Sequence, residues 1–289
     1  MVYLNFQEVV RLQNTSFLSY CHKNILLYDR EMKATLFYDS DTNSKVGRIG
    51  ERLGNKIHCF RNIVIANSIF DNTTLTCYSK ETYGHLWHYT LPAGEYSQGS
   101  NYSPVVSKEV TNILGVYAGI VWIVSDMGHL IGLETETGDC KYHLKTPINQ
   151  PAEWGNWEVF TPAKKSYFDA EKGTIFGLDH VHYWECDLNN PTESYLHFDI
   201  SGTRKEKNII PDFKGNWVGD EIFFGQNSFA QDATYVGIFN CKTRQITWTS
   251  RELGEEGVFK GISKVEYQDN RLYVLDRAST LHIFEDSPA

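Results

Sequence analysis

Pairs of histidines are the first residues in this sequence whose type and spacing could do chemistry. His180 and His182 stand two apart in "DHVHYW", so on a strand both side chains would point to one face. Two histidines on one face can begin a metal site, but a third ligand must come from elsewhere. We expect no metal, and His180 and His182 are the candidates that would hold one if that expectation failed.

Two further pairs have simpler interpretations. His85 and His88 in "GHLWHY" stand three apart, so a strand would place them on opposite faces. Glu134 and Glu136 in "LETETG" would share a strand face, as paired catalytic carboxylates do, but they stand beside a turn where solvated charge is ordinary. Neither pair predicts a reaction.

The sequence also lacks the motifs of the common catalytic and cofactor sites. It contains no G-x-S-x-G nucleophile turn, no P-loop and no dinucleotide-binding glycine motif. We therefore assign no catalytic residue and expect no cofactor.

Composition and charge restrict the class of partner. The 289 residues carry 27 Lys and Arg against 36 Asp and Glu, a net charge of −9, and 14% are aromatic. The one tight basic group, Arg204, Lys205 and Lys207, is interrupted by Glu206. A nucleic-acid partner is not expected, since such proteins present a basic surface. An acidic surface could instead attract a basic protein.

The sequence predicts a cytoplasmic protein that does not enter a membrane. The first residues, "MVYLNFQEVVRLQ", lack the features of a secretory signal. The longest apolar run, residues 113–124, is too short to span a bilayer. The six cysteines are scattered without a C-x-x-C pair, so we expect reduced thiols and neither a disulfide framework nor a zinc site.

A repeated sequence pattern predicts the architecture. Each copy is a short strand, a polar turn and a second strand. Five copies occur, at residues 34–50, 74–91, 129–146, 181–200 and 234–250, and a sixth at 280–286 has the first strand only. Two more apolar strands precede most copies, so the unit has four short antiparallel strands. The second strands start at residues 24, 62, 120, 174, 221 and 271, which is close to the spacing of propeller blades.

These units predict an all-β fold in one domain, residues 1–289, arranged as a six-bladed β-propeller. The last unit lacks its fourth strand, and the first residues, "VYLNFQEVV", form a spare strand that would close the ring. Seven blades is the main alternative, because the first strands of the units are irregular. A β-sandwich or two stacked barrels is less consistent with the sequence, because neither fold requires a repeated four-stranded unit.

The segment "DMGHLIGLETETGDCKYHL" resembles the quinoprotein-type (PQQ-type) propeller repeat through Gly128, Leu130, Leu133, Thr137 and Gly138. "LTCYSKETYGHLWHY" is a partial second match through Thr82, Gly84 and Trp87. The resemblance implies a propeller fold and no cofactor, since fold and function are separable.

Long connections are expected on one face of this propeller, where binding surfaces are usually built. They span residues 92–110, 147–165, 202–216 and 225–233. Large aromatic side chains anchor many protein interfaces, although such rings also seal the gaps between blades. The candidate partner-binding residues in or beside these connections are Tyr96, Tyr102, Trp154, Trp157, Phe213, Trp217 and Phe229.

The function expected from these observations is non-catalytic protein binding. A specific version is an immunity protein whose acidic surface neutralises a cognate bacterial toxin. One alternative is a propeller enzyme, a hydrolase, lyase or dehydrogenase, with its site at the mouth of the central channel. Another is a scaffold subunit of a larger assembly.

Overall fold

The computed structural model describes residues 15–21, 23–68, 73–92, 109–126, 128–149, 166–226, 234–253 and 261–285. Within these ranges the chain forms twenty-three strands and two short helices. It divides into two compact units, Met1–His143 and Leu144–Ala289.

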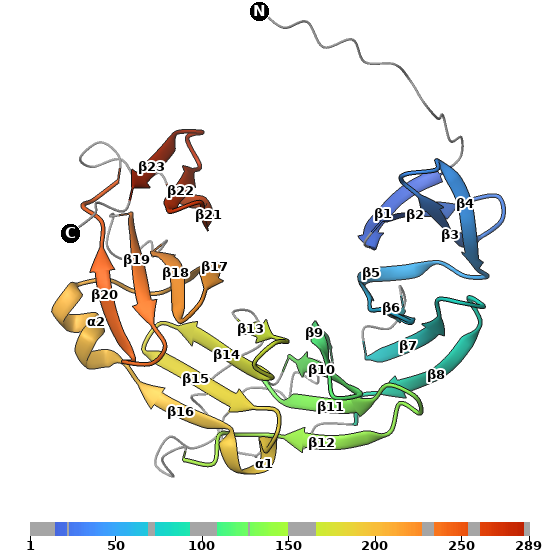
Figure 1. Cartoon of the computed structure of the whole chain (residues 1–289), viewed down its shortest axis with the longest axis horizontal. Helices are drawn as coiled ribbons and strands as arrows, with labels where there is room; N and C mark the ends of the chain where they lie inside the picture. Colours follow the sequence, from blue (N-terminus) through green and yellow to red (C-terminus); the bar gives the residue numbers. More distant parts are fainter. Residues whose placement is uncertain are drawn as a thin grey trace, which may run out of the picture. The chain divides into compact units, whose positions relative to one another are not determined.

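The first unit contains three four-stranded sheets, in each of which a strand pairs with the next strand in sequence (Figure 1). The first sheet consists of β1 (Thr15–Cys21), β2 (Asn24–Asp29), β3 (Ala34–Asp39) and β4 (Ser44–Ile49). The second consists of β5 (Leu53–Cys59), β6 (Ile63–Ser68), β7 (Thr74–Ser79) and β8 (His85–Thr90). The third consists of β9 (Val110–Tyr117), β10 (Ile120–Ser125), β11 (Leu130–Glu134) and β12 (Cys140–Leu144).

The second unit contains two four-stranded sheets and one with three strands in the described residues. The first sheet consists of β13 (Ser166–Asp169), β14 (Thr174–Asp179), β15 (His182–Asp187) and β16 (Leu196–Asp199), with α1 (Pro191–Ser194) before β16. After α2 (Ser201–Lys207) come β17 (Phe213–Val218), β18 (Glu221–Gln226), β19 (Tyr235–Asn240) and β20 (Gln245–Thr249). The last sheet consists of β21 (Ile262–Gln268), β22 (Arg271–Asp276) and β23 (Leu281–Glu285).

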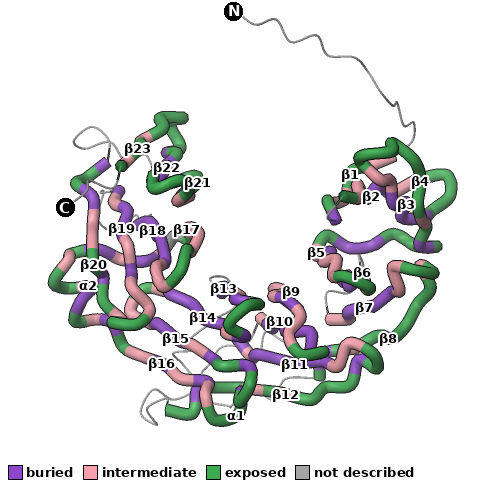
Figure 2. The backbone as a smooth tube through the Cα atoms, in the orientation of Figure 1, coloured by how far each residue is buried: buried purple, intermediate pink, exposed green. Residues whose placement is uncertain are grey.

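The middle strands of most of the four-stranded sheets are largely buried on both faces, and their sequences are accordingly mainly apolar, whereas β22 in the last sheet alternates exposed and buried residues. All six residues of β10, "IVWIVS", are buried, whereas β12 at the outer edge of the same sheet is mostly exposed (Figure 2). Val121 and Ile123 are fully buried, and each such side chain stabilises the fold by about 1.5–3 kcal/mol.

Hydrophobic clusters join neighbouring sheets within each unit. In the first unit one cluster joins β6–β8 to β9–β11, with Trp87 and Ile123 among its members, and another includes Phe37 and Tyr78. In the second unit Tyr183 and Phe239 belong to a cluster shared by the sheets of β13–β16 and β17–β20. Each unit is thus held together by sheets packed face to face.

The predicted repeat of four antiparallel strands is confirmed. The second strand of five units begins at the predicted residue, and β6 begins one residue later than predicted. The last described sheet ends at its third strand, as predicted, and Leu281 and Ile283 on that strand are 55% and 52% exposed. The spare strand predicted at residues 2–10 lies outside the described residues, so ring closure stays a prediction.

One predicted connection is wrong. Residues 202–216 were expected to form a long loop, but helix α2 spans Ser201–Lys207 and strand β17 begins at Phe213. The helix ends at Asn208, which has a left-handed backbone with φ of 50° and donates its N–H towards the carbonyls of Arg204 and Lys205. The basic residues of "RKEK" lie in the last helical turn, where positive charge stabilises the negative end of the helix dipole.

Candidate functional site

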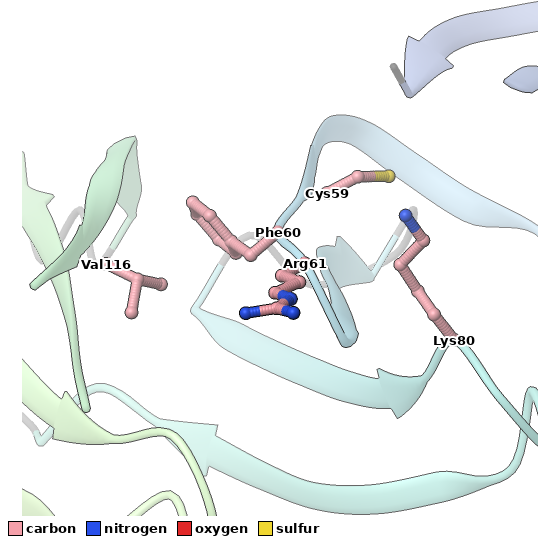
Figure 3. Close-up of a pocket in the computed structure, with 5 residues that line it drawn as sticks. All are labelled: Cys59, Phe60, Arg61, Lys80 and Val116. Atoms are coloured by element: carbon pink, nitrogen blue, oxygen red, sulfur yellow. The ribbon is translucent and has the colours of Figure 1, made fainter. Parts of the chain in front are cut away.

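A pocket of about 630 Å³ lies in the first unit, beside the turns that follow β5 and β7. Cys59, Phe60, Arg61, Lys80 and Val116 line it (Figure 3). Phe60 and Arg61 belong to the turn between β5 and β6, Lys80 comes directly after β7, and Val116 is near the end of β9. The repeat therefore brings residues from two adjacent sheets to one place.

Backbone hydrogen bonds hold the two turns in position. The Phe60 N–H donates to the carbonyl of Ile63 at 2.9 Å, which closes the turn that carries Arg61. The Lys80 N–H donates to the carbonyl of Asn62 at 2.9 Å and so ties the second turn to the first. The two cationic residues therefore start from backbone positions that are fixed relative to each other.

The apolar wall of the pocket is anchored in the core. Phe60 and Val116 are half-buried and pack against the hydrophobic cluster that joins the two sheets. The His58 ring stacks near Phe60 with 6.4 Å between ring centroids, and burial lowers the pKa of His58. Burial therefore favours the neutral form of His58 beside the two cations.

The electrostatics of the pocket differ in sign from those of the whole chain. Arg61 is exposed and Lys80 half-buried, and neither forms an ion pair with any other described residue. No carboxylate is among the described residues that line the pocket, although the chain carries a net charge of −9. Two unneutralised cations beside an aromatic ring can bind an anion that has an apolar portion.

Cys59 forms a disulfide with Cys21 at the edge of this pocket. The bond joins the end of β1 to the end of β5, with 5.4 Å between the Cα atoms and 38 residues of sequence separation. The expectation of fully reduced thiols is therefore wrong for this pair, because the repeat places two strand ends of adjacent sheets within bonding distance. The cytoplasmic location rested on that expectation and stays a prediction.

The structure separates the two metal candidates. His180 is not on a strand: it lies in the turn before β15 with φ of 51°, and its Nδ1 lies 2.5 Å from the Asp179 carboxylate. His182 begins β15, and its Nδ1 lies 2.9 Å from Nε2 of His197 on β16. In the ranges described above, no three His, Cys, Asp or Glu side chains form a group that could hold a metal ion.

A second histidine pair repeats this arrangement in the first unit. His129 precedes β11 as His182 begins β15, and its Nδ1 lies 2.9 Å from Nε2 of His143 on β12. His197 is 5% exposed, and burial and the neighbouring His182 lower its pKa to about 4. In each pair the two ring nitrogens lie at hydrogen-bond distance, which links the start of the third strand to the fourth strand of the sheet.

The other sequence-derived pairs also lie differently from expectation. A register shift between Cys77 and Tyr78, opposite the start of β8, places the His85 and His88 rings on the same side, with centroids 6.0 Å apart. Glu134 ends β11, whereas Glu136 lies in the following turn, so the two do not share a strand face. Glu134 instead pairs with Lys141 at 3.6 Å.

Most of the predicted partner-binding residues fall outside the described residues. They are Tyr96, Tyr102, Trp154, Trp157 and Phe229. Phe213 lies in β17 instead of the predicted loop, and Trp217, predicted at the edge of that loop, lies in the same strand. The Trp217 ring meets Phe176 edge to face with centroids 5.3 Å apart, so it contributes to the core while half-exposed. Its role in partner binding stays a prediction.

Arg61 and Lys80 were not singled out by sequence. The sequence feature that could have indicated this pocket is a cationic residue in each of the two short turns of one repeat unit, in "CFRN" and "YSKET". The sequence prediction of the partner-binding site instead followed the long connections, which are expected at the opposite ends of the strands. The pocket lies at the short-turn ends, because the β5–β6 and β7–β8 turns share one end of their sheet.

Comparisons with known proteins identify the fold class of this chain. No family model and no curated protein match this sequence. Among solved structures, BamB from Moraxella catarrhalis aligns with 91% of this chain and 70% of its own at 13% identity and a TM-score of 0.57. The computationally designed Ika8 protein aligns over 94% of this chain and 71% of its own at 10% identity, with a TM-score of 0.57. Kluyveromyces lactis Hsv2 aligns over 94% of this chain and 74% of its own at 10% identity, with a TM-score of 0.55.

These likenesses show a fold. BamB and Hsv2 are β-propellers, and the repeating four-stranded sheets of this chain agree with them. The β-propeller fold implied by the resemblance is therefore confirmed, and the specific repeat type stays a prediction. In the described residues, no helix is both long enough and apolar enough to cross a membrane.

Proposed function

We propose that this chain is a non-catalytic propeller that binds another protein, and that the pocket at Arg61 and Lys80 is one of its recognition sites. The supporting observation is the pair of cations without ion-pair partners among the described residues, set beside the half-buried Phe60 ring. Arginine and aromatic residues are enriched at the centres of protein interfaces.

The proposal includes a six-bladed ring closed by residues 2–10. Two exposed apolar residues on β23, Leu281 and Ile283, support it, as does the fact that this sheet has only three strands in the described residues. Amide hydrogen exchange tests the closure. Deletion of residues 1–11 is expected to lower protection across 281–285, whereas unchanged protection there would contradict closure by this segment.

The net charge of −9 favours a narrower candidate partner. In this version the chain is an immunity protein whose acidic surface attracts a basic bacterial toxin, and the aromatic residues of the long connections make the contact. Electrostatic attraction of this kind raises the association rate and weakens with salt.

Affinity purification with mass spectrometry tests both sites together. Wild-type protein is expected to retain a stoichiometric partner. Loss of that partner in Arg61→Ala/Lys80→Ala assigns the contact to the pocket, and loss in Trp154→Ala/Trp157→Ala assigns it to the long connections. Retention by both double variants, or the absence of a stoichiometric partner, would overturn the proposal.

A further inference from the structure

We propose that the pocket beside Arg61 binds a carboxylate attached to an apolar group, and that its natural source is the carboxyl-terminal residue of a partner chain. This inference rests on the proposed protein-binding function and names the chemistry that the pocket recognises. The shared chemistry could also be supplied by a small organic acid, so the experiment separates the two sources.

The charged half of the pocket fits a carboxylate. The guanidinium of Arg61 offers parallel N–H donors that match the two oxygens of a carboxylate, and Lys80 adds a point charge from the neighbouring turn. In the view of Figure 3, Arg61 lies between Phe60 and Lys80. Because Arg61 is exposed, a ligand can reach it from solvent.

The apolar half of the pocket argues against a bare inorganic anion. Phe60 and Val116 are half-buried, so each leaves part of an apolar surface exposed beside the cations. A ligand that covers this surface removes it from water, which phosphate or sulfate would not do. The last residue of a peptide places a carboxylate and an apolar side chain on one carbon atom and so satisfies both halves.

Pre-organisation strengthens the inference. The turn of Arg61 is closed by the Phe60–Ile63 hydrogen bond, and the turn of Lys80 is tied to it through Asn62. The Cys21–Cys59 disulfide fixes a further strand end at the same place. A site whose backbone is already ordered loses less entropy on binding.

Isothermal titration calorimetry on the full chain tests the proposal with matched probes. The first pair is 3-phenylpropanoate and 3-phenylpropanamide, and the second is a pentapeptide ending in phenylalanine with either a free or an amidated terminus. Inorganic phosphate is the third probe. Arg61→Ala and Lys80→Ala are the test variants, and Lys45→Ala, an exposed cation on β4 outside the pocket, is the matched control.

Each acid is expected to bind at least about tenfold more tightly than its amide, as one charge-assisted hydrogen bond would give. Arg61→Ala and Lys80→Ala should each remove most of that preference, while Lys45→Ala keeps it. Equal binding of acid and amide, or phosphate binding more tightly than either acid, would overturn the inference.

The two sources and the two proposals remain distinguishable. Binding of the small acid without the free-terminus peptide would keep the carboxylate chemistry and overturn the peptide source. If a stoichiometric protein partner depends on Arg61 and Lys80 while acid and amide bind equally, the protein-binding function stands and the carboxylate inference falls. If the peptide acid binds but purification retains no partner, the carboxylate chemistry of the pocket stands, and the protein-binding function falls together with the partner chain as the natural source.

Discussion

The indole Nε1 of Trp87 donates a hydrogen bond to the carbonyl of Thr135 in the next sheet, 2.9 Å away. Gly138 lies in the same turn as Thr135 with φ of +77°, and a Cβ there would stand 2.7 Å from the indole ring. The glycine and the tryptophan of the propeller repeat thus meet across neighbouring sheets. This contact explains why the turn needs glycine on two counts, backbone conformation and space.

A pair of glycine substitutions separates these two requirements. Gly119 has nearly the same backbone, φ of +78°, but open space where a Cβ would stand. Gly119→Ala should lower the free energy of unfolding by about 1–2 kcal/mol through backbone strain alone. Gly138→Ala should cost about 1–3 kcal/mol more, because the methyl group displaces the Trp87 ring. Urea denaturation of both variants measures the difference, and equal losses would contradict the contact.

Loss of the Cys21–Cys59 disulfide should destabilise the first unit. The bond closes a loop with 38 residues of sequence separation, and its removal in Cys21→Ser/Cys59→Ser is expected to cost about 2–4 kcal/mol. Thermal unfolding with and without dithiothreitol provides the measurement. Cys140→Ser, at an exposed free cysteine, is the control and should leave the transition in place. An unchanged transition in the double variant would show that the bond contributes nothing.

Stability should fall on acidification because of His197. Burial and the neighbouring His182 hold its pKa at about 4, below the ordinary value of 6.5, whereas Asp199 acts weakly in the opposite direction. The unfolded chain therefore binds the proton more readily. The stabilisation is complete above pH 6.5 and is lost as the pH falls towards 4, by up to about 3 kcal/mol.

Chemical denaturation at several pH values tests this expectation. The slope of unfolding free energy against pH between 6.5 and 4 should be smaller in His197→Gln than in wild type. Two-dimensional NMR titration of the imidazole gives an independent reading. A His197 midpoint near 6.5, or equal slopes in the two proteins, would refute the buried neutral state.

Arg61 and Lys80 should be nearly neutral for stability. Neither forms an ion pair within the described part of the chain, and surface changes of this kind usually stay within about 0.5 kcal/mol. Thermal unfolding of Arg61→Ala and Lys80→Ala should therefore match wild type. A large loss would mean that these cations serve the fold, and their effect on ligand binding would then need reinterpretation.

The sequence predicted the repeating unit well because its signals are local. "IVWIVS" is a continuous apolar run that suits a strand buried on both faces, and the turn "TETGD" ends the following strand where it should. Helix α2 was missed because its seven residues are mainly small or charged, with no apolar period to identify a helix.

The pocket and the disulfide were harder to predict because both depend on packing between sheets. Cys21 and Cys59 are 38 residues apart, and nothing near either residue marks the other as its partner. Arg61 and Lys80 resemble ordinary turn residues until the hydrogen bond between Lys80 and Asn62 places their turns together. Periodicity identifies which face of a strand is apolar, but it does not show which strand ends meet.

Strand β23 has a further consequence for handling this protein. Its outer ladder of peptide groups pairs with no other described strand, and two aliphatic side chains flank that open edge. Such an edge is a template on which another polypeptide can add by backbone pairing. Under the proposed closure by residues 2–10, material from which proteolysis has clipped that segment should polymerise edge to edge, and light scattering of stored samples would detect high-mass species.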